Sequence, residues 1–244
     1  MPEGPSIVIL REAAAQFRGR TVRGVEGDSR LDLGRMQGQR IESLRSWGKH
    51  FLIEFTGFSM RVHLLMFGTY CINERKEKPV RLSLRFDRGD ELNFYTCSLR
   101  YVEGPLDDAY DWSGDVMSDA WDPEAARRKL KARPDMLVCD ALLDQTVFSG
   151  VGNIIKNEAL YRIEVDPRSL VGKLPPTKRD ALIHEARQYS FDFLDWKRAG
   201  VLKQHWQVHT KTRCPHCGGP VVKKYLGKTN RRSFFCPRLQ VLYD

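Results

Sequence analysis

The sequence predicts an α+β chain of several domains: an N-terminal β-sandwich with a flanking helix, a helical domain, and a C-terminal, zinc-ribbon-like β-hairpin. Apolar and polar residues alternate through residues 21–102, which is typical of half-buried strands. From about 122 to 199 the apolar residues follow helical spacing instead. Residues 203–238 hold nine Lys or Arg and no Asp or Glu, so the whole net charge of +9 lies in this last stretch.

The first element expected is a short amphipathic helix over residues 6–18, ended by Gly19. It follows directly on the opening segment MPEGP, so the amino terminus leads into a rigid element. Its apolar positions are Ile7, Leu10, Ala14 and Phe17.

The β-rich part is clearest at residues 80–86, where apolar and polar residues alternate without a break. The turn at 87–90 and the return through 92–97 predict a hairpin. Together with the earlier alternating runs, this indicates a β-sandwich.

Residues 103–124 carry eight acidic residues and no basic one, and they are expected to connect the domains. Asp122-Pro123 is a typical helix start, with Asp as the cap and Pro in the first turn. The expected domains are residues 1–113, 122–202 and 203–244. The helices expected in the second domain cover residues 123–132, 136–147, 153–162 and 177–199.

The terminal module contains Cys214, Cys217 and, eighteen residues later, Cys236. This spacing is that of a zinc ribbon, in which two knuckles hold one tetrahedral ion. Leu239 stands where the fourth cysteine is expected.

Two readings of this ribbon stay open. Zinc held by three cysteines plus a histidine or water is one, with His209 and His216 as the available histidines. A metal-free ribbon held by its own apolar residues is the other.

The hairpin itself is predicted by two β-like arms, residues 221–226 and 231–236, around the turn at 227–230. Arg231 and Arg232 lie near its tip. A solvated turn explains these arginines equally simply, but the absence of acidic residues across the module favours contact with a polyanion such as nucleic acid over a role in solubility.

A second local feature is the turn Gly150-Val151-Gly152 before the helix that begins at Asn153. Two glycines at the start of a helix expose backbone N–H groups at its positive end, which suits one phosphate. Most such turns only connect helices.

Three motifs, MPEGP at the start, GVGNIIKNE after a helix, and RRSFFCP in the ribbon, resemble the formamidopyrimidine-DNA glycosylase/endonuclease VIII family, in the right order over nearly the whole chain. The resemblance implies a bifunctional DNA glycosylase and AP lyase with a helix-two-turn-helix domain. It implies double-stranded DNA with oxidised bases or AP sites as the partner, bound between the lobes. No catalytic metal is implied, and a monomer suffices.

The resemblance also assigns catalytic roles. Pro2 becomes a free secondary amine once Met1 is removed and acts as the nucleophile that forms a Schiff base with the sugar. Glu3 serves as acid and proton shuttle. Lys49 reaches toward the phosphate of the damaged nucleotide. Ser6 departs from the glutamate common at this position in the family.

For DNA binding, the resemblance assigns phosphate contacts to Asn153 and to Arg231, which lies five residues before Cys236. Arg232 is then auxiliary. A nucleotide-flipping enzyme also needs an apolar wedge, and the positions that match are Leu65, Met66 and Phe67. A buried strand would have the same pattern at those three positions.

Few residues separate the helix ending near Ala199 from the ribbon. The purine branch of the family carries a longer loop there, so this chain is similar to the endonuclease VIII branch, and oxidised pyrimidines are the expected substrates. The competing hypotheses are a DNA-binding protein that has lost the chemistry and an RNA-binding zinc-ribbon module. With no signal peptide or membrane span in the sequence, the expected location is intracellular, cytoplasmic or at the nucleoid.

Overall fold

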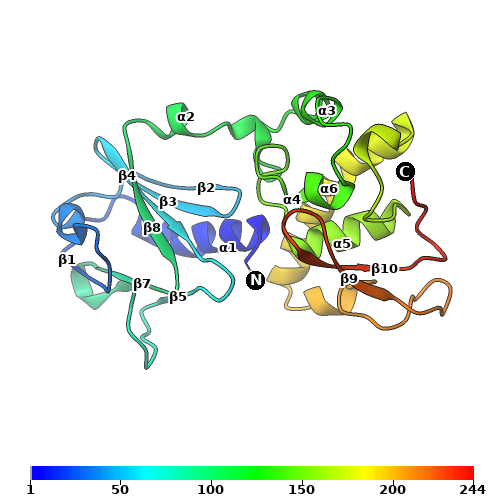
Figure 1. Ribbon diagram of the computed structural model, residues 1–244. Coiled ribbons are helices and arrows are strands. Elements are labelled where there is room, and N and C mark those ends of the chain that lie inside the picture. Colours follow the sequence, from blue (N-terminus) through cyan, green and yellow to red (C-terminus); the bar gives the residue numbers. More distant parts are fainter. Residues whose placement is uncertain (1) are drawn as a thin grey trace. The chain divides into compact units, whose positions relative to one another are not determined.

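The computed structural model describes residues 2–244, and it divides into two compact units (Figure 1). Unit 1 ends at Asp111 and unit 2 runs from Trp112 to Asp244. The division falls inside the acidic segment 103–124.

Unit 1 is mainly β-structure. Its helical elements are α1 (Gly4–Ala14), η1 (Ala15–Phe17), η2 (Leu33–Met36), η3 (Asp87–Gly89) and α2 (Leu106–Ala109). Its strands are β1 (Gly24–Glu26), β2 (Ser43–Trp47), β3 (His50–Phe55), β4 (Phe58–His63), β5 (Thr69–Ile72), β6 (Leu82–Arg85), β7 (Glu91–Tyr95) and β8 (Ser98–Glu103).

These strands form the predicted sandwich. One four-stranded antiparallel sheet has the order β1-β6-β7-β5, and the other has the order β2-β3-β4-β8. Phe51 of one sheet and Phe94 of the other meet in the shared core, with ring centroids 5.8 Å apart. The expected hairpin over 80–97 is β6 and β7, paired as predicted.

Helix α1 lies against β2 and β3 (Figure 1) and buries the predicted apolar residues in the sandwich core. It begins at Gly4, two residues earlier than predicted, because Pro5 fits the first turn of a helix. Its last turn tightens into η1, and Gly19 ends it in the left-handed conformation, at φ 78°.

Unit 2 is mainly helical and carries one hairpin. Its helical elements are η4 (Trp112–Gly114), α3 (Pro123–Lys131), α4 (Val138–Leu143), α5 (Asn153–Arg162), η5 (Val171–Lys173), α6 (Pro176–Arg198) and η6 (Leu202–His205). Its strands are β9 (Val222–Leu226) and β10 (Arg231–Phe235).

Helix α5 has the predicted bounds, and α6 differs from its prediction by one residue at each end. Helix α4 is shorter than the predicted 136–147. Asp144 ends it, since its carboxylate accepts the backbone N–H of Thr146 at 2.8 Å and closes a local turn in place of another helical turn.

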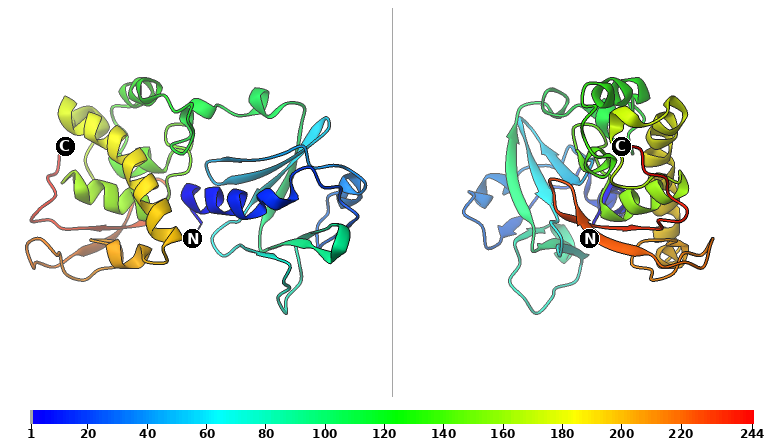
Figure 2. Two further views of the ribbon diagram at one scale, coloured as in Figure 1. Left: turned by 180° about the vertical axis from the view of Figure 1, so that it is seen from behind. Right: turned by 45° about the vertical axis from the view of Figure 1, so that its right-hand side comes forward.

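The hairpin β9–β10 has a small core of its own and packs on α5 (Figure 2). Tyr161 and Val208 join the ribbon residues Cys214, Phe234 and Cys236 in that core. Among residues 2–244, each helix is too short or too polar to serve as a membrane-spanning segment.

The cap of α3 gives a prediction about stability. Asp122 accepts the backbone N–H of Glu124 at 2.8 Å. Asp122→Ala removes this cap, so the free energy of unfolding is expected to fall by about 1 kcal/mol in urea titrations. Asp119→Ala, at an exposed position three residues earlier, is the control and should change it by less than about 0.5 kcal/mol. Equal effects of the two substitutions would contradict the capping role.

Candidate active site and nucleic-acid interface

The described chain begins with Pro2 and Glu3 at the start of α1. Pro2 is half-buried, and Glu3 is completely buried. The carbonyl of Glu3 accepts the backbone N–H of Ser6 at 2.8 Å, which fixes the first turn. Within residues 2–244, the Ser6 hydroxyl is buried without a hydrogen bond. The helix start therefore holds a half-buried residue and a buried carboxyl group in a fixed geometry.

Lys49 lies in the turn between β2 and β3 and is half-buried. The next residue, His50, pairs with His63 at the end of β4, and the loop 64–68 follows His63 directly. The strand register therefore places Lys49 and this loop at the same end of the sheet. Figure 1 shows the N-terminal end of α1 at that end of unit 1 as well.

The loop 64–68 exposes its apolar side chains. Leu65 is 45%, Met66 44% and Phe67 75% exposed. Its shape needs glycine at position 68, because a Cβ there would lie 1.9 Å from the carbonyl oxygen of Leu64. The alternative of a buried strand at these positions is thus wrong.

The two histidines at this end, His50 and His63, have lowered pKa values. Burial, reinforced by the positive charges of Arg61 and Lys49, lowers the pKa of His50 to about 3, and it lowers that of His63 in the same way. The positive charge here comes from Arg61 and Lys49.

In unit 2, the side chain of Gln145 holds the glycine turn that precedes α5. Gln145 accepts the backbone N–H of Gly150 at 3.1 Å and donates to the carbonyls of Leu143 and Val151 at 2.8 and 3.1 Å. Gly150 has φ 99°, a left-handed conformation that favours glycine. The N-terminus of α5 is therefore presented in a fixed orientation.

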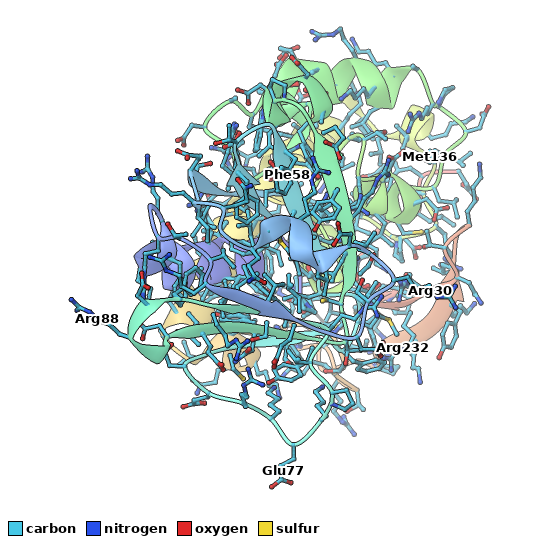
Figure 3. The ribbon with its side chains drawn as sticks, turned by 90° about the vertical axis from the view of Figure 1, so that its left-hand side faces the viewer. Arg30, Phe58, Glu77, Arg88, Met136 and Arg232 are labelled. Carbon is cyan, nitrogen blue, oxygen red and sulfur yellow. The ribbon has the colours of Figure 1, made fainter. Side chains whose placement is uncertain are left out.

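Asn153, the first residue of α5, is brought to the hairpin. Its side-chain amide donates to the backbone carbonyl of Arg232 at 3.0 Å. Arg231 and Arg232 are exposed at the start of β10, and Figure 3 shows Arg232 at the surface. The structure thus brings together the predicted asparagine and the predicted arginines.

The first residues of the hairpin turn, Gly227 and Lys228, lie against Asp140 of α4. Gly227 has φ 71°, and a Cβ there would lie 2.2 Å from a carboxylate oxygen of Asp140. The other carboxylate oxygen accepts the backbone N–H of Lys228 at 3.0 Å. The turn that precedes the arginines is therefore anchored at a defined place.

Sequence reasoning missed a buried polar cluster in α5. Lys156, Asn157 and Glu158 are each at most 1% exposed. Asn157 approaches the His209 ring at 2.9 Å and accepts the backbone N–H of Phe234 at 3.1 Å. The signal was present in the sequence, since three successive polar residues inside a short helix cannot all face water.

Glu158 caps the segment that leads into the ribbon. Its carboxylate accepts the backbone N–H groups of Gln207, Val208 and His209 at 2.9, 3.0 and 2.6 Å. These contacts tie α5 to the ribbon over about fifty residues of sequence.

The three ribbon cysteines lie together. The sulfur atoms of Cys214, Cys217 and Cys236 are within 4.8 Å of one another. This arrangement fits three of the four ligands of a tetrahedral zinc ion. Within residues 2–244, no histidine or carboxylate joins the group, so His209 and His216 are not its fourth member. The Tyr161 hydroxyl lies 3.1 Å from the sulfur of Cys214.

At the position of the expected fourth cysteine, the chain has an apolar side chain that packs. Leu239 lies against the small ribbon core. Gln240, 4% exposed, accepts the backbone N–H of Cys236 at 2.8 Å and donates to the carbonyl of Val165 at 2.8 Å. The second knuckle is thus held by hydrogen bonds and apolar contact.

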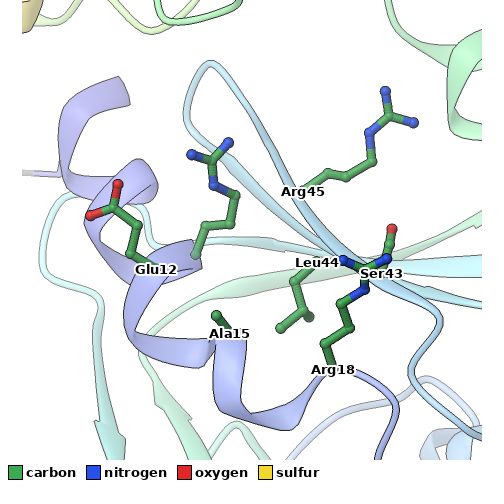
Figure 4. Close-up of a pocket in the computed structure, with 7 residues that line it drawn as sticks. Glu12, Ala15, Arg18, Ser43, Leu44 and Arg45 are labelled. Atoms are coloured by element: carbon green, nitrogen blue, oxygen red, sulfur yellow. The ribbon is translucent and has the colours of Figure 1, made fainter.

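A groove of about 390 Å³ beside α1 is lined by three arginines, Arg11, Arg18 and Arg45. Arg45 pairs with Asp107 at 2.8 Å, and Arg18 donates to the carbonyl of Glu42 at 3.4 Å. Figure 4 shows the guanidinium groups of Arg18 and Arg45 pointing to different places. The groove is therefore not a converging anion site.

A two-sheet sandwich, a helical unit with a glycine turn, and an attached cysteine hairpin together define the formamidopyrimidine-DNA glycosylase/endonuclease VIII fold, as predicted. The family model for the formamidopyrimidine-DNA glycosylase N-terminal domain matches residues 1–97. The model for the H2TH domain of the same glycosylase matches residues 113–189. The chain belongs to the formamidopyrimidine-DNA glycosylase family.

Among curated relatives, endonuclease 8-like 2 of Homo sapiens is 35% identical over 198 residues, covering 74% of this chain and 57% of the relative. Endonuclease 8-like 3 of Xenopus laevis is 29% identical over 233 residues, covering 90% of this chain and 38% of the relative. The chain thus spans about half the length of these relatives, or less.

Solved structures share the fold. A formamidopyrimidine-DNA glycosylase of Lactococcus lactis, non-covalently bound to DNA containing an AP site, has a TM-score of 0.85 at 20% identity, covering 98% of this chain and 99% of that one. A viral DNA glycosylase has a TM-score of 0.84 at 19% identity, covering 98% and 100%.

His209 gives a prediction about pH. Burial, with the positive charges of Lys156 and Arg232, lowers its pKa to about 4, below the ordinary value of about 6.5. As the pH falls, His209 is therefore protonated at a higher pH in the unfolded chain than in the folded one, and this favours unfolding. We expect unit 2 to lose up to about 3 kcal/mol of stability between pH 6.5 and pH 4 from this residue.

The measurement is urea unfolding at several pH values, comparing the wild type with His209→Gln. The variant has no imidazole to protonate, so its stability should fall less steeply over this range. Parallel pH profiles of the two proteins would contradict the assignment.

Proposed function

We propose that this chain is a bifunctional DNA glycosylase and AP lyase of base excision repair that acts on oxidised bases. The observation that carries the proposal is the segment directly before α1, where Pro2 and the buried Glu3 lead into the helix in a member of this family. The two DNA-glycosylase structures of the same fold and the endonuclease 8-like relatives support it.

In the proposed mechanism, removal of Met1 leaves Pro2 as a secondary amine. An α-amine has a pKa near 8, so part of it is unprotonated at neutral pH. Its nitrogen attacks C1′ of the damaged nucleotide, the glycosidic bond breaks, and the base leaves with its electron pair and a proton. Glu3 protonates the departing base, takes up the proton that the amine nitrogen releases, and passes it to O4′ as the C1′–O4′ bond opens, which leaves an iminium ion between the nitrogen and C1′.

The resulting iminium ion makes the C2′ hydrogen acidic. Loss of that proton expels the 3′ phosphate by β-elimination, and a second elimination expels the 5′ phosphate. The amine is released when water hydrolyses the iminium. No metal is needed for these steps.

DNA binding is assigned to both units. Lys49 in unit 1, and Asn153 with Arg231 and Arg232 in unit 2, would contact phosphates. A contiguous group of exposed apolar side chains is typical of a binding surface. We therefore propose Leu65, Met66 and Phe67 as the wedge that fills the space left by the flipped nucleotide.

The proposed substrates are oxidised pyrimidines in double-stranded DNA. Only residues 199–205, most of them in η6, separate α6 from the segment 206–211 that leads into the ribbon, so the chain has no longer covering loop between them. The similarity to relatives named endonuclease 8-like supports the same branch.

The ribbon is proposed to hold zinc through Cys214, Cys217 and Cys236, with no protein ligand at Leu239. When bound, the ion would act as a structural crosslink between the two knuckles. The phenol of Tyr161 and the backbone N–H groups of the first knuckle favour the thiolate form of Cys214 against the cost of burial and lower its pKa.

The catalytic proposal is tested by borohydride trapping. Protein that has lost Met1 is incubated with a duplex containing one AP site, reduced, and digested, and the adduct is mapped by mass spectrometry. We expect the adduct on Pro2. The control is a chain with a non-removable N-terminal extension, in which the Pro2 nitrogen is an amide and trapping should disappear while duplex binding remains.

The competing hypothesis is a non-catalytic binding protein. Protein that binds the duplex with Pro2 exposed as its first residue but forms no adduct would establish that alternative. An adduct on a lysine would show that the lyase chemistry uses another amine.

Zinc binding is tested by adding the missing ligand. Four-ligand ribbon sites bind zinc with about 10 to 16 kcal/mol, so one thiolate is worth on the order of 3 kcal/mol, or about a hundredfold in affinity. Leu239→Cys should therefore bind zinc far more tightly than the wild type in competition with a chromophoric chelator. Cys217→Ser should bind zinc more weakly than the wild type. Equal zinc affinities of all three proteins would contradict the assignment of the ribbon cysteines as zinc ligands.

A further inference from the structure

Lys156 is a charged side chain inside the packed part of unit 2. It is 1% exposed and lies one turn into α5, after the apolar Ile154 and Ile155. Burying an ammonium group is costly unless its hydrogen bonds are kept. A charged group in this place therefore needs an explanation in its hydrogen-bond partners.

The ammonium group donates to three oxygen atoms. These are the side-chain oxygen of Asn153 at 2.9 Å, the hydroxyl of Ser233 at 2.9 Å, and the backbone carbonyl of Arg232 at 3.2 Å. An ammonium group has three hydrogens, so it can donate to all three of these acceptors. One acceptor belongs to the start of α5 and two belong to β10.

This contact decides the orientation of the Asn153 amide. Only its oxygen can accept from an ammonium group, since the amide NH₂ would oppose the ammonium hydrogens. With the oxygen toward Lys156, the NH₂ group of Asn153 faces the carbonyl of Arg232 and donates to it at 3.0 Å. Lys156 and Asn153 thus donate to the same carbonyl, that of Arg232 in β10. This carbonyl joins the N-terminus of α5 to the hairpin strand that carries the arginines.

We propose that Lys156 is a positioning residue. It fixes the Asn153 side chain and the first residues of β10 so that the N-terminus of α5 and the arginines of the hairpin form one rigid phosphate-binding face. The inference rests on the proposed function, because it assigns that face to DNA. Lys156 itself is buried and touches no phosphate.

This role differs from that of a simple structural crosslink. A crosslink would contribute the same free energy to folding whether or not Asn153 is present to be oriented. A positioning residue that acts through Asn153 contributes to DNA binding only while the asparagine side chain is there. A double-mutant cycle on DNA affinity separates the two.

The test measures the Kd for a duplex containing a tetrahydrofuran AP-site analogue at fixed salt. The four proteins are the wild type, Lys156→Met, Asn153→Ala and the double variant. We expect Lys156→Met to weaken binding by about ten- to hundredfold in the wild type, the size of one charge-assisted hydrogen bond. In the Asn153→Ala background the same change should weaken it by less than about threefold.

Lys131→Met controls for the loss of one positive charge, since Lys131 is exposed on α3 in the same unit. Its effect should be below about threefold. Trapping at saturating AP-site DNA should show an unchanged maximal rate for Lys156→Met with a higher half-saturation concentration. Should that variant fail to fold, Lys156→Gln and Ser233→Ala, which remove only part of the contacts, take its place in the cycle.

Equal losses in both backgrounds, or no loss in the wild type, would overturn the positioning role. A failure of the proposed lyase mechanism would be seen in a different experiment. Wild-type protein that binds the duplex but leaves no Pro2 adduct would contradict the lyase mechanism, while the cycle, which reads only binding, would still decide the role of Lys156.

Discussion

The structure of unit 2 depends on the hydrogen bonds that leave α5 for the ribbon. A two-stranded hairpin is too small to be stable alone in water, and the core of β9–β10 contains few residues. Helix α5 supplies what is missing: Asn153, Lys156 and Asn157 bind β10, and Glu158 binds the segment before the first knuckle. The hairpin and the helix therefore form one structural element.

In unit 1 the sandwich serves a comparable purpose. Packing α1 against β2 and β3 fixes the direction of the helix, and the register of β3 with β4 fixes the ends of the adjoining loops. As a result, the helix start, the turn with Lys49 and the apolar loop 64–68 all lie at one end of the unit. Three segments far apart in the sequence thus come to the same end of the unit, two through strand pairing and one through the packing of α1.

The elements predicted well are those whose limits are set by local chemistry. Helix α5 begins after Gly152 and was predicted to the residue, and the hairpin was predicted from its two arms and turn. The end of α4 was not, because a side-chain turn at Asp144 competes there with the helix. For α1, the strong helix-start tendency of Pro5 outweighed the apolar periodicity used to place it.

The residues of the candidate site also fall into those that the sequence could identify and those that it could not. The cysteines, arginines and Asn153 could be named from spacing and from the resemblance to the family. Three successive polar residues show that part of α5 is buried with its polar groups, but the ribbon partners of Lys156 and Glu158 lie about fifty to eighty residues away and could not be named from a local pattern. For the ribbon, the sequence placed Leu239 at the fourth position but left open whether His209 or His216 takes its place, because the side chains that meet there depend on packing.

The second knuckle bears on what the shape of the ribbon depends on. Gln240 joins Cys236 to Val165, and the next residue continues the pairing through the bond from Val241 to Glu164. A knuckle already closed by these bonds keeps its shape when a metal ligand is substituted. Leucine at position 239 is thus compatible with a closed second knuckle, so the shape of the hairpin that carries Arg231 and Arg232 does not depend on a fourth metal ligand at this position.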